Sequence, residues 1–516
     1  MRRVLPAILL GVLLSSAANV WAVNAWADGD DPTPPRAVLD AEAQRIAVMD
    51  VAKDAVLAVF AANGEGGGSG VVISADGFAL TNFHVVQPCG KAMKCGMADG
   101  RIYDAVIVGV DPTGDVALIK LFGRDDFPHA VIGDSDAVEV GAWCFAMGNP
   151  FLLATDFQPT VTYGIVSGVH RYQYPSGTIL EYADCIQIDA SINPGNSGGP
   201  LFDAQGRLIG INGRGSFEKR GRVNVGAAYA ISINQIKNFL GYLHSGRVVD
   251  HATLGARVSS DDRGHVVVNE IAETSDAYRR GLRYDDEIIS FGGRTISTPN
   301  GFKNALGIYP KGWRIPLSFR HDGRRYDVLV RLAGLHATEE LLEKTEGRQH
   351  RMPMPLPKPG EQPKPGEGRK PEDRPEPKPI EIPIPRSHPA LPRANTEPTV
   401  PEVIDNHFEA RRGYANYYYN RLHRDRILAA WSAAAGLTDA GGRWRLAGEL
   451  VGGGGAFLLE LDDGETRLKV PAFEMTWTAT DDFTSSLLPP DSGGLLPALN
   501  LWRRLAVEGA DNFGEV

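Results

Sequence analysis

Short runs of β-branched and apolar residues recur between glycine-containing turns from residue 66 to about residue 243. Many short runs at close spacing, with little helical periodicity, are typical of an antiparallel barrel or sandwich. This part of the chain is therefore predicted to be mainly β, with a closing helix at 233–243. The runs lie at residues 71–73, 105–110, 116–121, 138–146, 161–169, 185–188, 208–211 and 227–233.

The rest of the chain divides into further units, as a length of 516 residues requires. A segment at 28–54, with an amphipathic helix from residue 40, leads into the first unit at 55–245. A second strand-rich unit follows at 250–333. Residues 334–403 are a polar linker that becomes rich in proline, lysine and glutamate, which predicts an extended, disordered spacer. Residues 404–516 read as an α+β unit of unknown role, opening with a helix at 405–435.

The N-terminus has the pattern of an export signal at 1–27. Arg2 and Arg3 precede an apolar run at 4–14, and Ala25-Trp26-Ala27 offers a small-x-small cleavage site. The apolar run is short for a bilayer span, although an uncleaved anchor stays open as an alternative. No later stretch reaches that length. The chain is therefore expected to be periplasmic or secreted, without an integral membrane span once the signal is removed.

The net charge of −10 argues against a nucleic-acid binder, which needs a basic face. Cys89 and Cys95 close a short loop, and a disulfide there would contribute about 2 kcal/mol in the chain-entropy model. We expect this pair to be bridged, in keeping with an oxidising compartment. The spacing does not suit a CxxC metal site, and no metal or cofactor is predicted. Cys144 and Cys185 lie in apolar runs and are expected to be buried.

Ser197 lies in the glycine-rich segment Gly195-Asn196-Ser197-Gly198-Gly199. The glycines allow a sharp turn and a close approach of substrate. They also leave the amides of Gly195 and Ser197 free to point into one pocket, as the paired donors of an oxyanion hole do. A serine hydroxyl becomes nucleophilic only beside a base, so the segment predicts a catalytic turn if a histidine lies near.

His84 and Asp115 are the candidates for that base and for its orienting acid. His84 ends an apolar run, and Asp115 opens another, where a carboxylate is costly to bury without a partner. A histidine is such a partner, and the order His, Asp, Ser is one of the known arrangements of a catalytic triad.

Around these three residues the chain resembles the HtrA-type (DegP/DegQ/DegS-like) serine proteases, which have a chymotrypsin-like double β-barrel. The resemblance implies that His84, Asp115 and Ser197 form the triad. It covers about residues 55–245 and weakens beyond. The matching segments are SGVVISADGFALTNFHVV at 69–86, VDPTGDVALIK at 110–120, IGDSDAVEVGAWCFAMGNPF at 132–151, TVTYGIVSGVHR at 160–171 and IQIDASINPGNSGGPL at 186–201.

The second unit resembles a PDZ domain, because RGLRYDDEIISFGG at 280–293 is similar to the AGLxxGDxIxxxNG stretch of that family. PDZ domains bind a peptide C-terminus as an added strand at a sheet edge. The resemblance implies that Leu254, Gly255 and Ala256 form the carboxylate-binding loop. Asp285 departs from the family pattern, where a glycine is usual.

By analogy with the fold, the substrate pocket is expected beside Ile192 and the strand end at Asn212, Gly213 and Arg214. Three functions remain open. The first is a serine endopeptidase that degrades misfolded or unfolded envelope or secreted proteins, with peptide binding by the PDZ unit. The second is a site-specific protease activated by a peptide on that unit, and the third is a non-proteolytic chaperone or scaffold. Expected partners are unfolded or C-terminal peptide segments. A homotrimer is the family's arrangement, but residues 28–59 lack the aromatic residues that support it.

Overall fold

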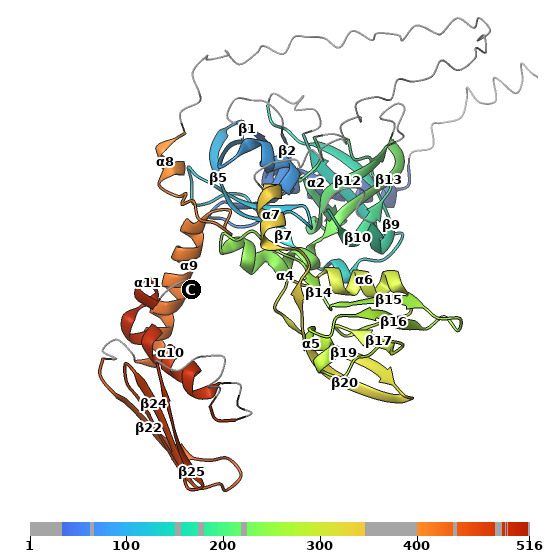
Figure 1. Ribbon diagram of the computed structural model, residues 1–516. Helices are drawn as coiled ribbons and strands as arrows, with labels where there is room; N and C mark the ends of the chain where they lie inside the picture. Colours follow the sequence, from blue (N-terminus) through green and yellow to red (C-terminus); the bar gives the residue numbers. More distant parts are fainter. Residues whose placement is uncertain are drawn as a thin grey trace, which may run out of the picture.

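The computed structural model describes residues 34–61, 67–149, 156–173, 180–193, 195–217, 224–345, 400–436, 441–479, 488–490, 492 and 494–513. The expected signal at 1–27 and the proline-rich part of the linker lie outside these residues. Figure 1 shows two barrels together, the second strand-rich unit beside them, and the C-terminal sheet at the far end of a long helix.

The first barrel is a closed antiparallel sheet, in which β1 pairs with β2 on one side and with β4 on the other. Its interior is filled by aliphatic side chains such as Leu57, Val72 and Ile119, each at most 1% exposed. Closure leaves no strand edge unpaired. In pairing order the strands are β1 (Val56–Ala61), β2 (Gly68–Val72), β3 (Phe78–Thr81), β6 (Val116–Leu121), β5 (Ile102–Asp111) and β4 (Ala92–Met97).

The second barrel closes because β11 pairs with both β8 and β12, while β7 joins β12 in parallel. The prediction of a mainly β chain with a chymotrypsin-like double barrel is confirmed. Helix α4 (Ile233–His244) follows the last strand, as expected. In pairing order the strands are β11 (Pro200–Asp203), β8 (Trp143–Gly148), β9 (Thr160–Gln173), β10 (Tyr182–Ile188), β13 (Asn224–Ser232), β12 (Arg207–Phe217) and β7 (Val131–Ile132).

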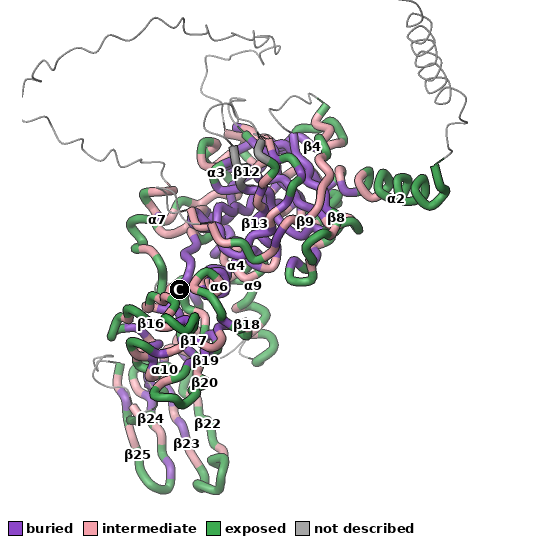
Figure 2. Tube along the Cα trace, turned by 90° about the vertical axis from the view of Figure 1, so that its right-hand side faces the viewer, coloured by how far each residue is buried: buried purple, intermediate pink, exposed green. Residues whose placement is uncertain are grey.

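The short helical segments of this first unit lie mainly at its turns. Helix α2 (Arg36–Ala52) precedes β1 and, among its residues, buries only Ala52, so it extends from the barrels as an exposed arm (Figure 2). The others are η1 (Lys53–Ala55), α3 (Phe83–Val86), η2 (Gln87–Cys89) and η3 (Ser135–Ala137).

The second unit is an antiparallel sheet in which β15 (Ala256–Ser260) occupies one edge, beside helix α6 (Pro299–Gly307). Asp285 has φ 65° and takes the left-handed conformation of a glycine, so the turn keeps its shape with an aspartate. The remaining elements are β14 (Ala252–Thr253), β16 (Val266–Ile271), α5 (Asp276–Arg279), β17 (Glu287–Phe291), β18 (Arg294–Thr295), β19 (Arg314–His321), β20 (Arg324–Arg331), β21 (Ala333–Gly334) and α7 (Thr338–Thr345).

The C-terminal unit is α+β, with an antiparallel sheet against helix α10 (Leu495–Glu508). The expected helix at 405–435 is shorter than predicted: α9 (Tyr417–Ala435) begins only after Asn416, whose side chain caps it. Gly413, at φ 87°, breaks the helical path before it. The other elements are α8 (Glu402–Asp405), β22 (Trp444–Glu449), β23 (Ala456–Leu461), β24 (Glu465–Val470), β25 (Phe473–Thr478) and α11 (Ala510–Phe513).

After the linker, the chain returns to the first barrel. Asn416 is fully buried and donates from Nδ2 to the carbonyl of Ile107 on β5, over 2.8 Å. Gly246, at the end of α4, lies so close to Asn416 that an added Cβ would be 1.9 Å from its carbonyl oxygen. Residues 402–420 therefore form a strap on the barrel rather than a freely tethered tail.

Candidate active site

His84 and Asp115 are brought together by the pairing of two strands. His84 lies in α3, directly after β3, and Asp115 directly precedes β6. These strands pair in register, with Thr81 opposite Ala117. Two residues that are 31 positions apart thus meet at the same end of the barrel.

The two side chains form a close pair. Nδ1 of His84 lies 2.8 Å from Oδ2 and 3.0 Å from Oδ1 of Asp115, and the amide of His84 donates to Oδ1 over 3.0 Å. The Asp115 side chain is fully buried, whereas that of His84 is 43% exposed. Burial lowers the pKa of His84, but the charge and hydrogen bond of Asp115 together outweigh it, so the pKa is raised. Nε2 is thus the nitrogen left to act as a base.

Asp115 is held on every side. Its backbone has φ 57°, an uncommon conformation for a residue other than glycine. Asn82 Nδ2 donates to its carbonyl oxygen over 2.8 Å, and the amide of Phe83 donates to the same oxygen over 3.2 Å. The hydroxyl of Tyr182, on β10, donates to Oδ2 over 2.6 Å. Sequence reasoning missed Tyr182, because nothing local marks a tyrosine at the start of an apolar run.

The Ser197 turn packs against the same end of the first barrel. Ser69, on β2, donates from its amide to the carbonyl of Ser197 over 2.8 Å and from its hydroxyl to that of Gly195 over 2.7 Å. A Cβ added to Gly198 would lie 2.3 Å from Thr81 Oγ1 and 3.0 Å from the amide of Asn82. Asn82 is two residues before His84, so the turn places Ser197 beside the His84–Asp115 pair.

Glycine is required at two points of this turn. Gly195 has φ 105° and Gly198 has φ 84°, conformations that other residues rarely adopt. Among the described residues, the amides of Gly195 and Ser197 donate to no acceptor, and no hydrogen bond of 3.5 Å or less joins the Ser197 hydroxyl to the His84 ring. Such contacts often tighten only with substrate. Both amides remain the predicted oxyanion donors.

The predicted pocket residues have different surroundings. Ile192 is 2% exposed and belongs to the core of the second barrel. Asn212 is buried and supports the Ser197 turn: its carbonyl accepts from the amide of Gly198, and Nδ2 donates to the carbonyl of Pro200. An added Cβ on Gly213 would lie 2.6 Å from the Tyr182 ring. The side chain of Arg214 lies outside the described part of the chain.

The predicted peptide-binding loop lies at the edge strand of the second unit. Leu254 is 3% exposed and packs in that unit's core. Gly255 has φ 72°, and an added Cβ would lie 2.6 Å from Ser275 Cβ, so the loop needs glycine there. Ala256 begins β15, where a peptide strand would add.

The disulfide predicted between Cys89 and Cys95 is absent, since all four cysteines are free thiols. Cys95 lies on β4 with its side chain in the barrel core, while Cys89 is half-buried in η2 and donates to the carbonyl of Val85 over 3.5 Å. Burial raises the pKa of the Cys89 thiol to about 11. Cys144 and Cys185 are buried, as expected from their apolar runs.

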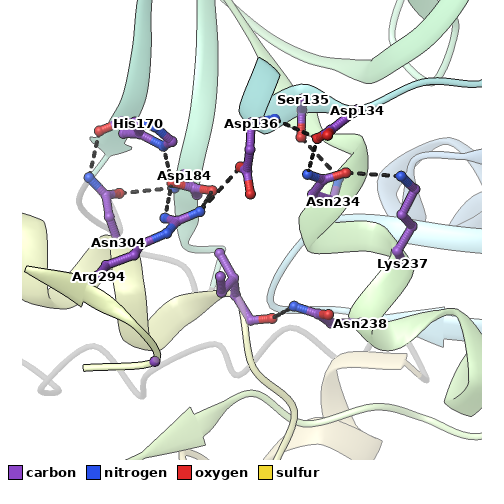
Figure 3. Close-up of polar contacts among 12 residues, drawn as sticks. Asp134, Ser135, Asp136, His170, Asp184, Asn234, Lys237, Asn238, Arg294 and Asn304 are labelled. Atoms are coloured by element: carbon purple, nitrogen blue, oxygen red, sulfur yellow. Dashed lines mark hydrogen bonds and ion pairs between the residues drawn. The ribbon is translucent and has the colours of Figure 1, made fainter. Parts of the chain in front are cut away.

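The second unit is docked on the second barrel by a polar cluster (Figure 3). Arg294 reaches Oδ1 and Oδ2 of Asp184 over 2.7 and 3.0 Å, and Nδ1 of His170 lies 2.7 Å from Oδ1. Asn304, on α6, accepts from the amide of Asp184 and donates to the carbonyl of His170. Asp136, His170 and Asp184 have donor atoms close enough for a metal, but the Arg294 guanidinium forms ion pairs with both carboxylates.

Among the described residues, no helix is both long and apolar enough to cross a membrane.

Comparisons with known proteins agree with the sequence resemblance. Residues 68–211 match the trypsin-like peptidase domain family. A probable periplasmic serine endoprotease, DegP-like, from Chlamydia trachomatis is 34% identical over 279 residues, which cover 51% of this chain and 53% of that protein. The periplasmic serine endoprotease DegP of Escherichia coli K12 is 36% identical over 278 residues, covering 51% and 56%. The chain therefore spans about half the length of the curated relatives that it matches.

Among solved structures, an HtrA-type protease AlgW with tripeptide is 30% identical and has a TM-score of 0.47. The match covers 57% of this chain and 98% of that one. The family model and the curated relatives confirm that the double-barrel part of the chain resembles the HtrA-type (DegP-like) serine proteases.

Proposed function

We propose that this chain, which resembles the HtrA-type serine proteases, is a serine endopeptidase with Ser197 as nucleophile. The supporting observation is the His84–Asp115 pair at 2.8 Å, with Gly198 of the Ser197 turn packed on Thr81 and Asn82. A glycine-rich turn without a histidine–carboxylate pair beside it would not be enough to propose a protease. A buried carboxylate, an exposed imidazole and a serine turn at one end of a barrel match the requirements of acyl transfer.

In the proposed reaction, the Ser197 hydroxyl attacks a peptide carbonyl while Nε2 of His84 takes its proton. Asp115 orients the ring through Nδ1 and stabilises the imidazolium that forms. The oxyanion then accepts from the amides of Gly195 and Ser197, where one lost donor typically costs about 10²–10³ in rate. His84 returns the proton to the leaving amine and later activates the water that frees the acyl group.

The proposed substrates are unfolded segments of periplasmic or secreted proteins. Curated relatives are named periplasmic serine endoproteases, and the N-terminal pattern of an export signal suits the same compartment. The edge strand β15, beside α6, suits an extended peptide that ends at the loop of Leu254 to Ala256. Ile192 and the strand end at Asn212 to Arg214 stay the proposed wall of the substrate pocket, and a homo-oligomer stays a proposal.

A second candidate is a protease that is activated by a peptide. The observation that favours it is the position of α6, which flanks β15 on one side and packs on β9 and β10 of the protease unit on the other. A peptide added at β15 would thus bind next to the helix that docks the two units.

Cleavage of casein, an unfolded protein, tests both candidates. We expect the wild-type chain to cut casein at many sites and Ser197→Ala to leave it intact. Cleavage that begins only after a C-terminal peptide is added would favour the activated protease. If wild type and Ser197→Ala both leave casein intact, with and without peptide, the enzyme reading is wrong and the scaffold function gains support.

A further inference from the structure

We propose that His251 is a positioning residue for this reaction: it holds the turn that carries Asp115 and thereby sets the orientation of His84. This inference rests on the proposed function. His251 is remote from the triad in sequence and lies at the start of the second unit, where its side chain contacts Asp111 of the protease unit.

The turn in question runs from Asp111, the last residue of β5, to Asp115. Oδ1 of Asp111 accepts from the amides of Thr113 and Gly114, over 3.1 and 2.8 Å. These bonds shape the turn and deliver Asp115 with φ 57°. A left-handed aspartate is strained and persists only where its surroundings over-determine it. The geometry of Asp115 therefore depends on what holds Asp111.

His251 supplies the partner for the second oxygen of Asp111. Nε2 lies 2.8 Å from Oδ2, and the two side chains are 1% and 2% exposed. The ring stacks on Phe239 of α4, with centroids 4.4 Å apart. Nδ1 has no hydrogen-bond partner among the described residues. The tautomer with its proton on Nε2 is consistent with both facts, because that proton is donated to the carboxylate and Nδ1 keeps only a lone pair.

The Asp111–His251 pair is packed tightly against Gly114. A Cβ added to Gly114 would lie 2.4 Å from Oδ2 of Asp111 and 2.9 Å from Nε2 of His251. The glycine in the middle of the turn is thus packed directly against the bonded pair. A displacement of either partner is transmitted to Gly114 and, through one peptide bond, to Asp115.

The backbone of His251 is fixed from the other side. Its carbonyl accepts from the amide of Leu335 over 2.9 Å, and it bridges to Pro310 of the second unit. Just before it, Val248 bridges to Val110 and the amide of Val249 donates to the carbonyl of Val110 over 2.8 Å. His251 is thereby anchored between the barrel and the second unit.

Loss of the Nε2–H donor of His251 is expected to disturb the turn that carries Asp115. Without it, Oδ2 of Asp111 is a buried, unpaired charge, a costly state that the turn relieves by shifting. A misplacement of about 1 Å at a catalytic group costs on the order of 10²-fold in rate. His251 is not among the residues proposed for the substrate pocket or the peptide-binding loop, so we expect kcat to fall while KM changes little.

Three variants test this role. His251→Phe keeps the ring on Phe239 but removes the donor, and we expect kcat on an unstructured substrate to fall about 10- to 100-fold with KM within about twofold. His251→Gln offers an amide N–H in place of Nε2 and should recover most of that loss. His321→Phe is the matched control, because it removes a histidine–carboxylate pair with Asp286 in the second unit, far along the chain from this turn. Its kcat should equal that of wild type.

The folded fraction of each variant is measured by circular dichroism and thermal melting, and His251→Leu replaces His251→Phe if the latter does not fold. Equal kcat for wild type and the donor-free variant overturns the inference. Equal loss in His251→Gln and the donor-free variant also overturns it, since bulk packing would then be the cause. If wild type itself shows no Ser197-dependent hydrolysis, the proposed function fails instead.

Discussion

The hydroxyl of Tyr182 donates to Oδ2 of Asp115 over 2.6 Å, across 67 residues of sequence and from the second barrel to the first. It is the contact that ties the buried carboxylate of one barrel to a strand of the other. The same oxygen lies 2.8 Å from Nδ1 of His84. Tyr182 and His84 therefore both contact the same carboxylate oxygen, and the Tyr182 hydrogen bond offsets part of the negative charge that acts on His84.

Tyr182→Phe should lower kcat by about 10-fold while the fold is kept, because the ring remains and only the donor is lost. With the donor gone, the Asp115 charge acts more fully on the His84 imidazolium. The acidic limb of the kcat/KM profile should therefore move to higher pH. A profile identical to that of wild type would show that Tyr182 has no part in the site.

The pH dependence of wild type follows from the raised pKa of His84. A base must be neutral to accept a proton, so kcat/KM rises with pH through that pKa. Because Asp115 raises the pKa above the ordinary 6.5, the midpoint of the rise should lie above pH 6.5. A midpoint below 6.5, in a profile measured on a substrate without titrating groups, would contradict the pairing of His84 with Asp115.

Docking of the second unit should weaken when Arg294 is removed. Arg294→Ala leaves Asp184, whose side chain is 1% exposed, without its guanidinium partner, at a cost of about 2 kcal/mol. Hydrogen exchange in α6, β9 and β10 should then become faster. The matched control is Arg257→Ala, which breaks an exposed ion pair in the same unit and should change nothing measurable. Unchanged exchange in Arg294→Ala would show that the cluster does not hold the units together.

The free energy of unfolding should also respond to pH through this cluster. The hydrogen bond to Asp184 raises the pKa of His170 above 6.5 despite burial, so its stabilising contribution is complete below pH 6.5 and is lost as pH rises through the higher value. His170→Gln should flatten this part of the curve in thermal melts at pH 6 and pH 8. An equal slope in wild type and variant would rule this contribution out.

Asn416 should be the residue on which the C-terminal strap depends. Its side chain donates to the carbonyls of Ile107 and His407 and accepts from the amides of Glu409 and Tyr418. Asn416→Ala removes the partner of these backbone groups, of which the Ile107 carbonyl is buried, at about 1–3 kcal/mol for each that water cannot reach. We expect a lower melting temperature and easier proteolysis after residue 400. The exposed Asn512→Ala serves as control, and equal melting of the two variants would contradict the strap.

The double barrel and the triad candidates could be predicted because their signals are local. Short β-branched runs and glycine turns specify strands, and the segments around His84, Asp115 and Ser197 each carry a recognisable pattern. The local patterns do not show that His84 and Asp115 are in contact. The pairing of β3 with β6 brings them together. Tyr182 and His251 have no local signal in the sequence. They contact Asp115 and Asp111 only because the fold brings β10 and the segment around residue 251 next to the turn at 111–115.

Two predictions failed for physical reasons. Loop length alone favoured a disulfide between Cys89 and Cys95, but the direction of each side chain decides whether sulfurs meet, and Cys95 points into the barrel core. Helical periodicity suggested a helix from residue 405, but Gly413 has a non-helical backbone and Asn416 caps a helix that begins only at Tyr417. The burial of Cys95 decided the first outcome, and a glycine followed by an N-cap decided the second.

The central claim is that Ser197 is a nucleophile activated by His84, and labelling with a fluorophosphonate probe followed by mass spectrometry tests it most directly. We expect one adduct, on the peptide that contains Ser197, formed at the same rate as casein cleavage is lost. Ser197→Ala should take up no label, and His84→Ala should label far more slowly. Labelling of the wild type on another serine, or none at Ser197 while casein is cleaved, would contradict the account.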